Sequence, residues 1–140
     1  MTLVLASQAL TRGIHHVGLT VRDLDETRRF FTDALGFRQV GEDAGYPASF
    51  LSDGTSVVTL WRAEDPARAV PFDRKRHVGL HHLALGVVDA AALDAAFAAA
   101  TAWPGVEVDV APGPTRPGST ARHALVRIPG GIRLEFYALG

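Results

Sequence analysis

Apolar and polar residues alternate along residues 13–21, and almost the same alternation returns along residues 79–87. Each run carries a pair of histidines near its start and ends in a valine. A period of two is typical of a β-strand whose two faces have different surroundings. Because the offset between the runs is constant at 66 residues (His16 to His82), the sequence predicts one structural module that occurs twice.

The same period decides which histidine of each pair can face a ligand. In the first run, His16 shares a face with Gly18, whereas His15 shares the opposite face with apolar residues. In the second run, His82 lies likewise on the face of Ala84. Small neighbours leave room above a strand, so we predict that His16 and His82 lie on the side where a ligand has space.

The pattern after each run predicts the same order of elements in both halves. An acidic first turn and an apolar stripe predict a helix over residues 24–35, and an alanine-rich segment predicts its counterpart over residues 90–101. Each half therefore contains a strand, a helix and three further strands. The predicted strands are 13–21, 37–42, 48–51 and 56–61 in the first half, and 79–87, 106–110, 123–128 and 132–137 in the second.

Segments rich in proline separate these elements. Residues 63–78 have two prolines, mixed charges and no period, which is typical of a linker. Residues 111–121 hold three prolines and two glycines, and we predict a loop there that acts as a lid or determines specificity. The predicted organisation is an N-terminal extension (1–12) and a single domain (13–140), made of module one (13–62), the linker (63–78) and module two (79–140).

Composition narrows the classes of function. With 140 residues, 47% of them hydrophobic, the chain has enough apolar material for one core. A formal net charge of −1 without long charged blocks argues against nucleic acid or an anionic membrane as a partner. No apolar run approaches the roughly 20 residues of a membrane span, and residues 1–10 lack the charged start of a signal peptide. We therefore expect a cytoplasmic protein.

The repeat also brings together candidate metal ligands. The chain has no cysteine, so any metal must be held by nitrogen and oxygen. Aligning the last strands of the two modules makes Thr59 equivalent to Glu135, as His16 is to His82. Two imidazoles and one carboxylate form the arrangement associated with non-haem Fe²⁺, which leaves positions open for substrate and oxygen; Mn²⁺, Zn²⁺, Ni²⁺ and Co²⁺ are also compatible. Thr59 is a poor ligand, so we expect it to hydrogen-bond near the metal or to form a pocket wall.

Three other residues are candidates for chemistry or binding. The last predicted hairpin brings His123 beside Glu135, where it can act as an acid or base, although a turn register shifted by one residue would make it a structural histidine. Trp61 and Tyr137 share the faces of Thr59 and Glu135 and are candidates for an apolar pocket, with ordinary core packing as the alternative.

Four segments carry a resemblance to a known family, and they are residues 13–24, 30–37, 82–85 and 129–136. They resemble the vicinal oxygen chelate superfamily, which contains glyoxalase I, the type I extradiol dioxygenases, methylmalonyl-CoA epimerases, fosfomycin-resistance transferases and bleomycin-resistance proteins. The resemblance implies an α+β fold in which two tandem βαβββ modules form a curved mixed-sheet cleft, with metal ligands on the first and last strands of each module. These positions fall on His16, His82 and Glu135, whereas the fourth, which is Glu, Gln or His in glyoxalase I, is Thr59.

We therefore expect a metal-dependent enzyme that acts on a small organic substrate able to chelate the metal, with Glu135 and His123 as catalytic residues. Three ligands favour dioxygenase-like chemistry, but familiar extradiol enzymes use two such domains in one chain, so a lyase or isomerase of the glyoxalase type is an alternative. A protein that sequesters an antibiotic is a third. We also expect a homodimer, because the cleft can be closed by the modules of one chain or of two.

Overall fold

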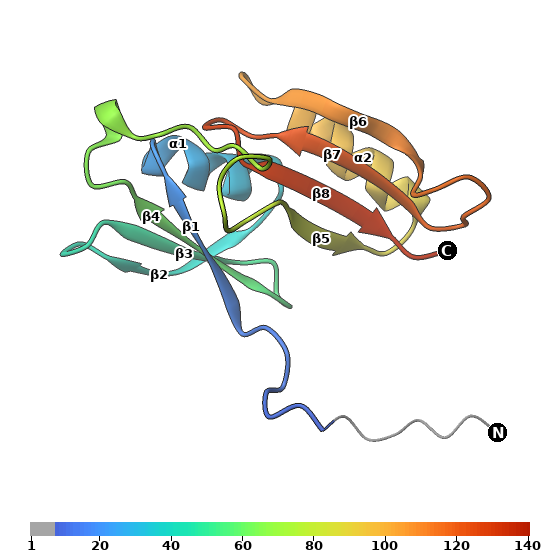
Figure 1. Cartoon of the computed structure of the whole chain (residues 1–140), viewed down its shortest axis with the longest axis horizontal. Helices are drawn as coiled ribbons and strands as arrows, with labels where there is room; N and C mark the ends of the chain where they lie inside the picture. The colour runs from blue at the N-terminus through green and yellow to red at the C-terminus, as the bar shows by residue number, and fades with distance from the viewer. Residues whose placement is uncertain (1–7) are drawn as a thin grey trace.

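The computed structural model describes residues 8–140, in which two βαβββ modules form two separate four-stranded sheets (Figure 1). This is the predicted α+β architecture of two tandem modules. Residues 1–7 of the predicted N-terminal extension lie outside the described part. Module one contains β1 (His16–Val21), α1 (Leu24–Arg29), a π-helical turn (Phe30–Ala34), β2 (Arg38–Asp43), β3 (Ala48–Ser52) and β4 (Val57–Arg62). A 3-10 turn (Pro66–Arg68) precedes module two, which contains β5 (Leu83–Val87), α2 (Ala90–Thr101), β6 (Glu107–Pro114), β7 (Arg122–Arg127) and β8 (Arg133–Ala138).

Both sheets have the same mixed topology. The strand orders are β1-β4-β3-β2 and β5-β8-β7-β6. In each sheet the first strand of the module lies at one edge and pairs in parallel with the last strand of that module. The registers match as well, since Gly18 lies opposite Thr59 and Ala84 lies opposite Glu135. The structural equivalence of Thr59 and Glu135, predicted from the repeat, is therefore confirmed.

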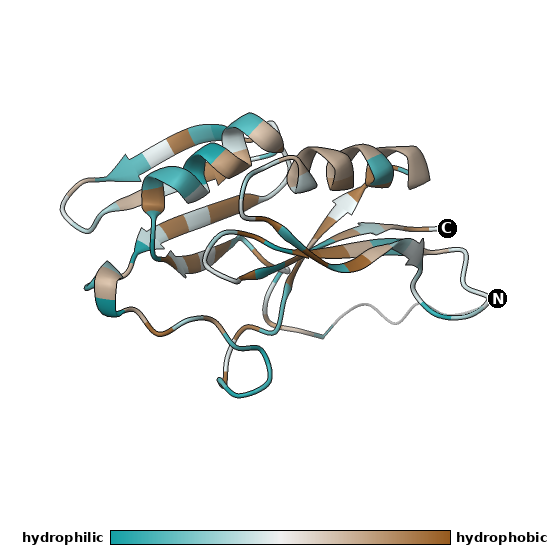
Figure 2. Ribbon diagram, turned by 90° about the horizontal axis from the view of Figure 1, so that it is seen from above, coloured by the Kyte–Doolittle hydropathy of each residue, from teal (hydrophilic) through white to brown (hydrophobic). Residues whose placement is uncertain are grey.

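One core spans both modules and determines which sheet faces are buried. Alternate residues of the central strands, such as Leu60 of β4 and Phe136 of β8, belong to one cluster of buried side chains that also includes Leu93 of α2. Phe30 packs edge-on against Trp103, with ring centroids 6.1 Å apart, and so joins the helical layers of the two modules. The helices follow one another along the molecule (Figure 2). Residues at the intervening strand positions lie on the opposite, helix-free face of each sheet.

The helix predicted over residues 24–35 is present, but its second half winds more widely than an α-helix. The backbone N–H of Leu35 donates to the carbonyl of Phe30 at 3.3 Å, which is the five-residue spacing of a π-turn. Phe30 and Phe31 are both fully buried in this turn. The described helices include none long and apolar enough to cross a membrane.

The prediction of a loop over residues 111–121 is wrong for its first part, because β6 continues to Pro114. Two register shifts interrupt its pairing with β7, one between Val108 and Val110 and one between Val110 and Gly113. β6 is an edge strand, so Pro112 and Pro114 can lie in it without removing hydrogen bonds from a second neighbour. The connection that can act as a lid is therefore reduced to residues 115–121.

A charged cluster lies on β6, β7 and β8. Nε of Arg133, a residue only 8% exposed, donates to Oδ2 of Asp109 at 2.7 Å, and Nε of Arg127 forms an ion pair with Oδ1 at 2.8 Å. Burial raises the pKa of Asp109, but the hydrogen bond from Arg133 and the charge of Arg127 outweigh burial and hold that pKa below its usual value. The ionised form of Asp109 is therefore the one that stabilises the fold.

We expect Asp109→Asn to lower the free energy of unfolding at pH 7 by about 3 kcal/mol, because it leaves the Arg133 guanidinium largely buried without its anionic partner. A lowered folded-state pKa gives stability that is present above the unfolded-state pKa and is lost as the pH falls through the folded-state pKa. The difference in free energy of unfolding between Asp109→Asn and wild type should therefore become smaller as the pH is lowered. Urea denaturation at several pH values measures it, with the exposed Asp94→Asn as control; equal stability of Asp109→Asn and wild type at pH 7 would contradict the prediction.

Candidate functional site

Glu135 is the centre of the second module's helix-free face. Its neighbours in β8, Leu134 and Phe136, point into the core, so the carboxylate points the other way and remains only 9% exposed. Nδ1 of His123 lies 2.8 Å from Oε2, and Nε2 of His82 lies 3.6 Å from Oε1. The imidazole of His123 on β7 and that of His82, directly before β5, thus approach the two oxygens of one carboxylate.

The turn between β7 and β8 produces this arrangement. Gly130 and Gly131 have φ values of 96° and 90°, in the left-handed region that favours glycine. The register that follows pairs Leu125 with Glu135 and places His123 two residues further along the same face. The predicted position of His123 beside Glu135 is confirmed. Tyr137 lies opposite His123 in this register, on the same helix-free face, and is partly buried.

Both histidine pairs make the same internal contact. Nδ1 of His81 lies 2.8 Å from Nδ1 of His82, and Nδ1 of His15 lies 2.9 Å from Nδ1 of His16. A hydrogen bond between two such atoms needs one ring to donate and the other to accept. If His82 donates from Nδ1, its Nε2 carries a free lone pair toward Glu135, which is the tautomer that a metal ligand needs.

The pKa of His81 is consistent with its acting as the hydrogen-bond acceptor for His82. Desolvation, followed by the nearby charges of His82, Arg133 and Arg74, lowers the pKa of His81 below its usual value of 6.5. This lowering favours the neutral imidazole of His81, which can accept a hydrogen bond at Nδ1. The hydrogen bond to His81 thus favours the tautomer of His82 that can bind a metal.

Thr59 occupies the equivalent position in the first module, but its hydroxyl is engaged. It accepts a hydrogen bond from Nε1 of Trp61 at 2.9 Å and donates to the carbonyl of Val17 at 3.4 Å. Trp61 in turn contacts Tyr46 and Phe50, two aromatic residues that the sequence prediction did not include. They come from β3 and the turn before it, so only the register of β3 against β4 could have revealed them.

The predicted metal ligands lie on two sheets. His16 is in β1 of the first sheet, whereas His82 and Glu135 belong to the second. Among residues 8–140, no three His, Asp or Glu side chains converge as a group able to hold a metal ion. Ligand atoms around one ion at about 2.1 Å lie about 3.0–3.5 Å apart. The 3.6 Å between Nε2 of His82 and Oε1 of Glu135 is close to this spacing, whereas His16 belongs to the other sheet.

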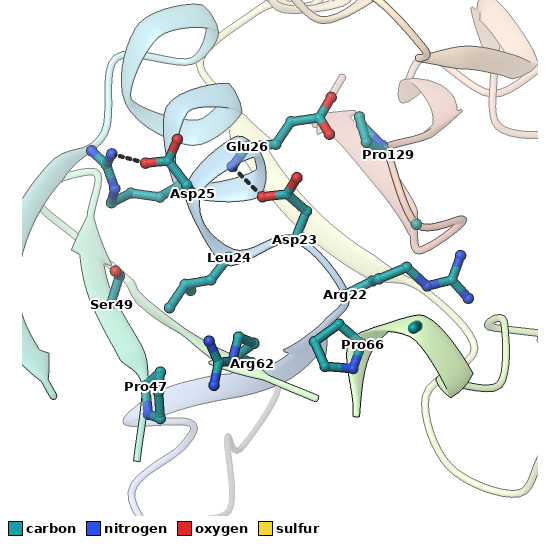
Figure 3. A pocket seen from close by; sticks show the side chains of 13 residues that line it. Arg22, Asp23, Leu24, Asp25, Glu26, Pro47, Ser49, Arg62, Pro66 and Pro129 are labelled. Atoms are coloured by element: carbon teal, nitrogen blue, oxygen red, sulfur yellow. Dashed lines mark hydrogen bonds and ion pairs between the residues drawn. The ribbon is translucent and has the colours of Figure 1, made fainter. Parts of the chain in front are cut away.

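A large cavity lies away from these residues. It has a volume of about 740 Å³ and is formed by the start of α1, the start of β3, the end of β4 and the turn before β8 (Figure 3). Two of its acidic side chains already interact with α1. Asp23 accepts a hydrogen bond from the backbone N–H of Glu26 at 2.9 Å, and Asp25 forms an ion pair with Arg28. None of the predicted site residues lines this cavity. We therefore locate the candidate site on the helix-free faces.

Comparisons with known proteins point to one family. The family model described as Glyoxalase/Bleomycin resistance protein/Dioxygenase superfamily matches residues 13–136. The chain is 32% identical over 149 aligned positions to a 2-epi-5-epi-valiolone epimerase from Actinomyces sp., with 90% of this chain and 79% of the relative covered.

Two further matches differ in extent. A catechol-2,3-dioxygenase from Bacillus subtilis (strain 168) is 51% identical over 41 residues, which are 29% of this chain and only 14% of the dioxygenase. Among solved structures, a glyoxylase/bleomycin resistance protein/dioxygenase domain from Frankia sp. EAN1pec has a TM-score of 0.73 and 27% identity, with 93% of each chain covered.

Proposed function

The chain belongs to the glyoxalase/bleomycin resistance protein/dioxygenase superfamily, and from this we propose that it is a metal-dependent enzyme whose small organic substrate carries two neighbouring oxygen atoms. The observation that carries the proposal is the position of Glu135, with His82 at 3.6 Å and His123 at 2.8 Å. A nearly buried carboxylate between two imidazoles is typical of a site for metal binding or proton transfer.

We assign His16, His82 and Glu135 as the metal ligands. Fe²⁺ is favoured because two histidines and one carboxylate suit it, and Mn²⁺, Zn²⁺, Ni²⁺ and Co²⁺ are the alternatives. When bound, the ion supplies Lewis acidity toward the two substrate oxygens. Glu135 holds negative charge beside the substrate, and His123 keeps that carboxylate oriented through its 2.8 Å contact.

A homodimer completes the site. One chain carries His16 on one sheet and the pair of His82 and Glu135 at the other, and no group of three ligands forms within residues 8–140. We therefore propose that each His16 meets the second sheet of another copy. A two-fold axis would create two equivalent sites at once, since every contact in such a pair occurs twice. The helix-free faces of the two chains then form the cleft.

Three protein donors favour dioxygenase-like chemistry. The hydroxyl of Thr59 is engaged with Trp61 and Val17, so the fourth position of the repeat leaves room for substrate and oxygen. Oxygen uptake with catechols of different substitution tests this reaction class.

Isomerisation by proton transfer is the second candidate, because His123 contacts Glu135 and the relative matched over 79% of its length is named an epimerase. In that reaction His123 would remove a proton next to a substrate carbonyl and return it. Exchange of deuterium from solvent into a hydroxyketone, without oxygen uptake, would identify this class.

Elemental analysis is the first test of the proposal. After expression in medium supplemented with iron, manganese, zinc, nickel and cobalt, we expect about one divalent ion per chain. Protein that stays free of metal in every preparation and after reconstitution would overturn the enzymatic proposal and favour a protein that sequesters its ligand.

We also expect His81→Ala to weaken metal binding about tenfold, because the variant removes the acceptor that holds His82 in its ligand tautomer. Competition with a chelator measures the affinity. His77→Ala is the matched control, since His77 lies in the linker, outside the histidine pairs. Equal affinities of His81→Ala and wild type would contradict a role for this contact.

A further inference from the structure

Three aromatic rings gather on the helix-free side of the first sheet. Tyr46 and Trp61 have ring centroids 5.0 Å apart at an interplanar angle of 40°, and Phe50 and Trp61 have centroids 5.8 Å apart at 51°. Phe50 lies opposite Thr59 in the register of β3 and β4, so these rings share the face of His16 and Thr59. Tyr46 remains 54% exposed. Phe50 and Trp61 are partly buried. A contiguous apolar patch that solvent can reach is typical of a binding site.

Two glycines make room for these rings. A Cβ at Gly18 would lie 3.4 Å from Nε1 of Trp61 and 3.2 Å from Oγ1 of Thr59, so the indole reaches across β4 toward β1. A Cβ at Gly41 would lie 2.8 Å from Cδ2 of Phe50, closer than real Cβ atoms approach. A larger residue at Gly18 would press on Trp61, and one at Gly41 would displace Phe50, so both glycines allow the rings to lie across the sheet.

Thr59 holds the central ring in place. Its hydroxyl accepts the indole N–H of Trp61 at 2.9 Å and is itself tied to the carbonyl of Val17. Because the N–H is already used, Trp61 offers a ligand its aromatic face and not a hydrogen bond. Thr59, Trp61 and Phe50 carry no charge at neutral pH, so the cluster suits a flat, uncharged group.

We propose that Tyr46, Phe50 and Trp61 form a stacking platform for a planar, uncharged ring of the substrate, and that Thr59 is the positioning residue that holds Trp61. This inference rests on the proposed function, since it assigns the substrate class of that site. His16 precedes Gly18 by one strand period on the same face of β1, so a ring stacked on the platform lies on the side of the first module's proposed metal donor.

The test compares two probes, catechol and cis-1,2-cyclohexanediol, by calorimetric titration of metal-loaded and chelator-treated protein. Both probes place two oxygens on neighbouring ring carbons, but only catechol is flat. We expect Trp61→Leu to weaken catechol binding about tenfold and diol binding less than twofold. Because each probe is compared with itself, the different acidities of the two probes cancel.

The Thr59 variants test the positioning role. Thr59→Val, which keeps the shape of the side chain but removes the hydroxyl, should weaken catechol binding about threefold and change the near-ultraviolet circular dichroism of Trp61. Thr59→Ser should retain both signals. Trp103→Phe, which keeps a ring against Phe30 in the core, should leave catechol binding unchanged.

The platform is overturned if Trp61→Leu binds catechol as tightly as wild type, or if catechol and the diol lose affinity equally. It is also overturned if Trp61→Leu dissociates a dimer in light scattering without changing catechol binding, since the rings would then pack against a second copy. Failure of the proposed function gives a different result from failure of the platform. In that case wild-type protein would hold no metal, but chelator-treated protein would still prefer catechol to the diol, and this preference would depend on Trp61.

Discussion

Replacing Glu135 with glutamine should weaken metal binding by at least about a hundredfold and reduce activity to a similar extent. Glutamine has nearly the shape of glutamate, but it lacks the negative charge that a divalent ion needs and offers a weaker oxygen donor. The variant also removes an acceptor that is 2.8 Å from His123 and 3.6 Å from His82, so both imidazoles lose their anionic partner.

Elemental analysis and chelator competition measure this effect, and circular dichroism shows whether the fold is retained. His77→Ala is again the control, because it removes an imidazole outside the candidate site. Stoichiometric metal in Glu135→Gln, held as tightly as in wild type, would show that Glu135 is not a ligand.

Mixing two inactive variants should restore activity if the site is shared between chains. His16→Ala and Glu135→Gln each damage every site of their own homodimer. In a mixed dimer, the intact His16 of one chain meets the intact Glu135 of the other, so one of its two sites is complete. Random exchange of equal amounts should therefore restore about one quarter of wild-type activity.

The measurement is activity and metal content after unfolding and refolding the two variants together, or after exchange of subunits at low concentration. Separately refolded samples that are pooled afterwards provide the control. If all ligands came from one chain, mixing would restore nothing, because every chain in the mixture carries a damaged site.

Much of the fold could be predicted because the information is local and occurs twice. The period of two in residues 13–21 and 79–87 predicted which side chains enter the core, and α2 forms over residues 90–101 as expected. The equivalence of Thr59 and Glu135 and the position of His123 followed from the repeat and from one glycine-rich turn. Short-range sterics determine such features, so they can be read along the chain.

Other features depend on register between strands far apart in sequence. The extension of β6 to Pro114 requires register shifts against β7, and an edge position that no local pattern reveals. The aromatic cluster requires β3 to pair with β4 so that Phe50 lies opposite Thr59. The pairing of Arg133 with Asp109 likewise joins residues on β8 and β6, which are not adjacent strands.

The sequence by itself determined which side chains are the candidate donors, because the repeat makes His16 equivalent to His82 and Thr59 equivalent to Glu135. Only the tertiary structure decided how these donors are distributed: His82 and Glu135 lie together, while His16 lies on another sheet. The physical reason is that one hydrophobic core, formed by helices and sheet faces of both modules, joins the modules. The packing of this core sets the directions of the two helix-free faces, and the alternation of residues within a single strand does not contain that information.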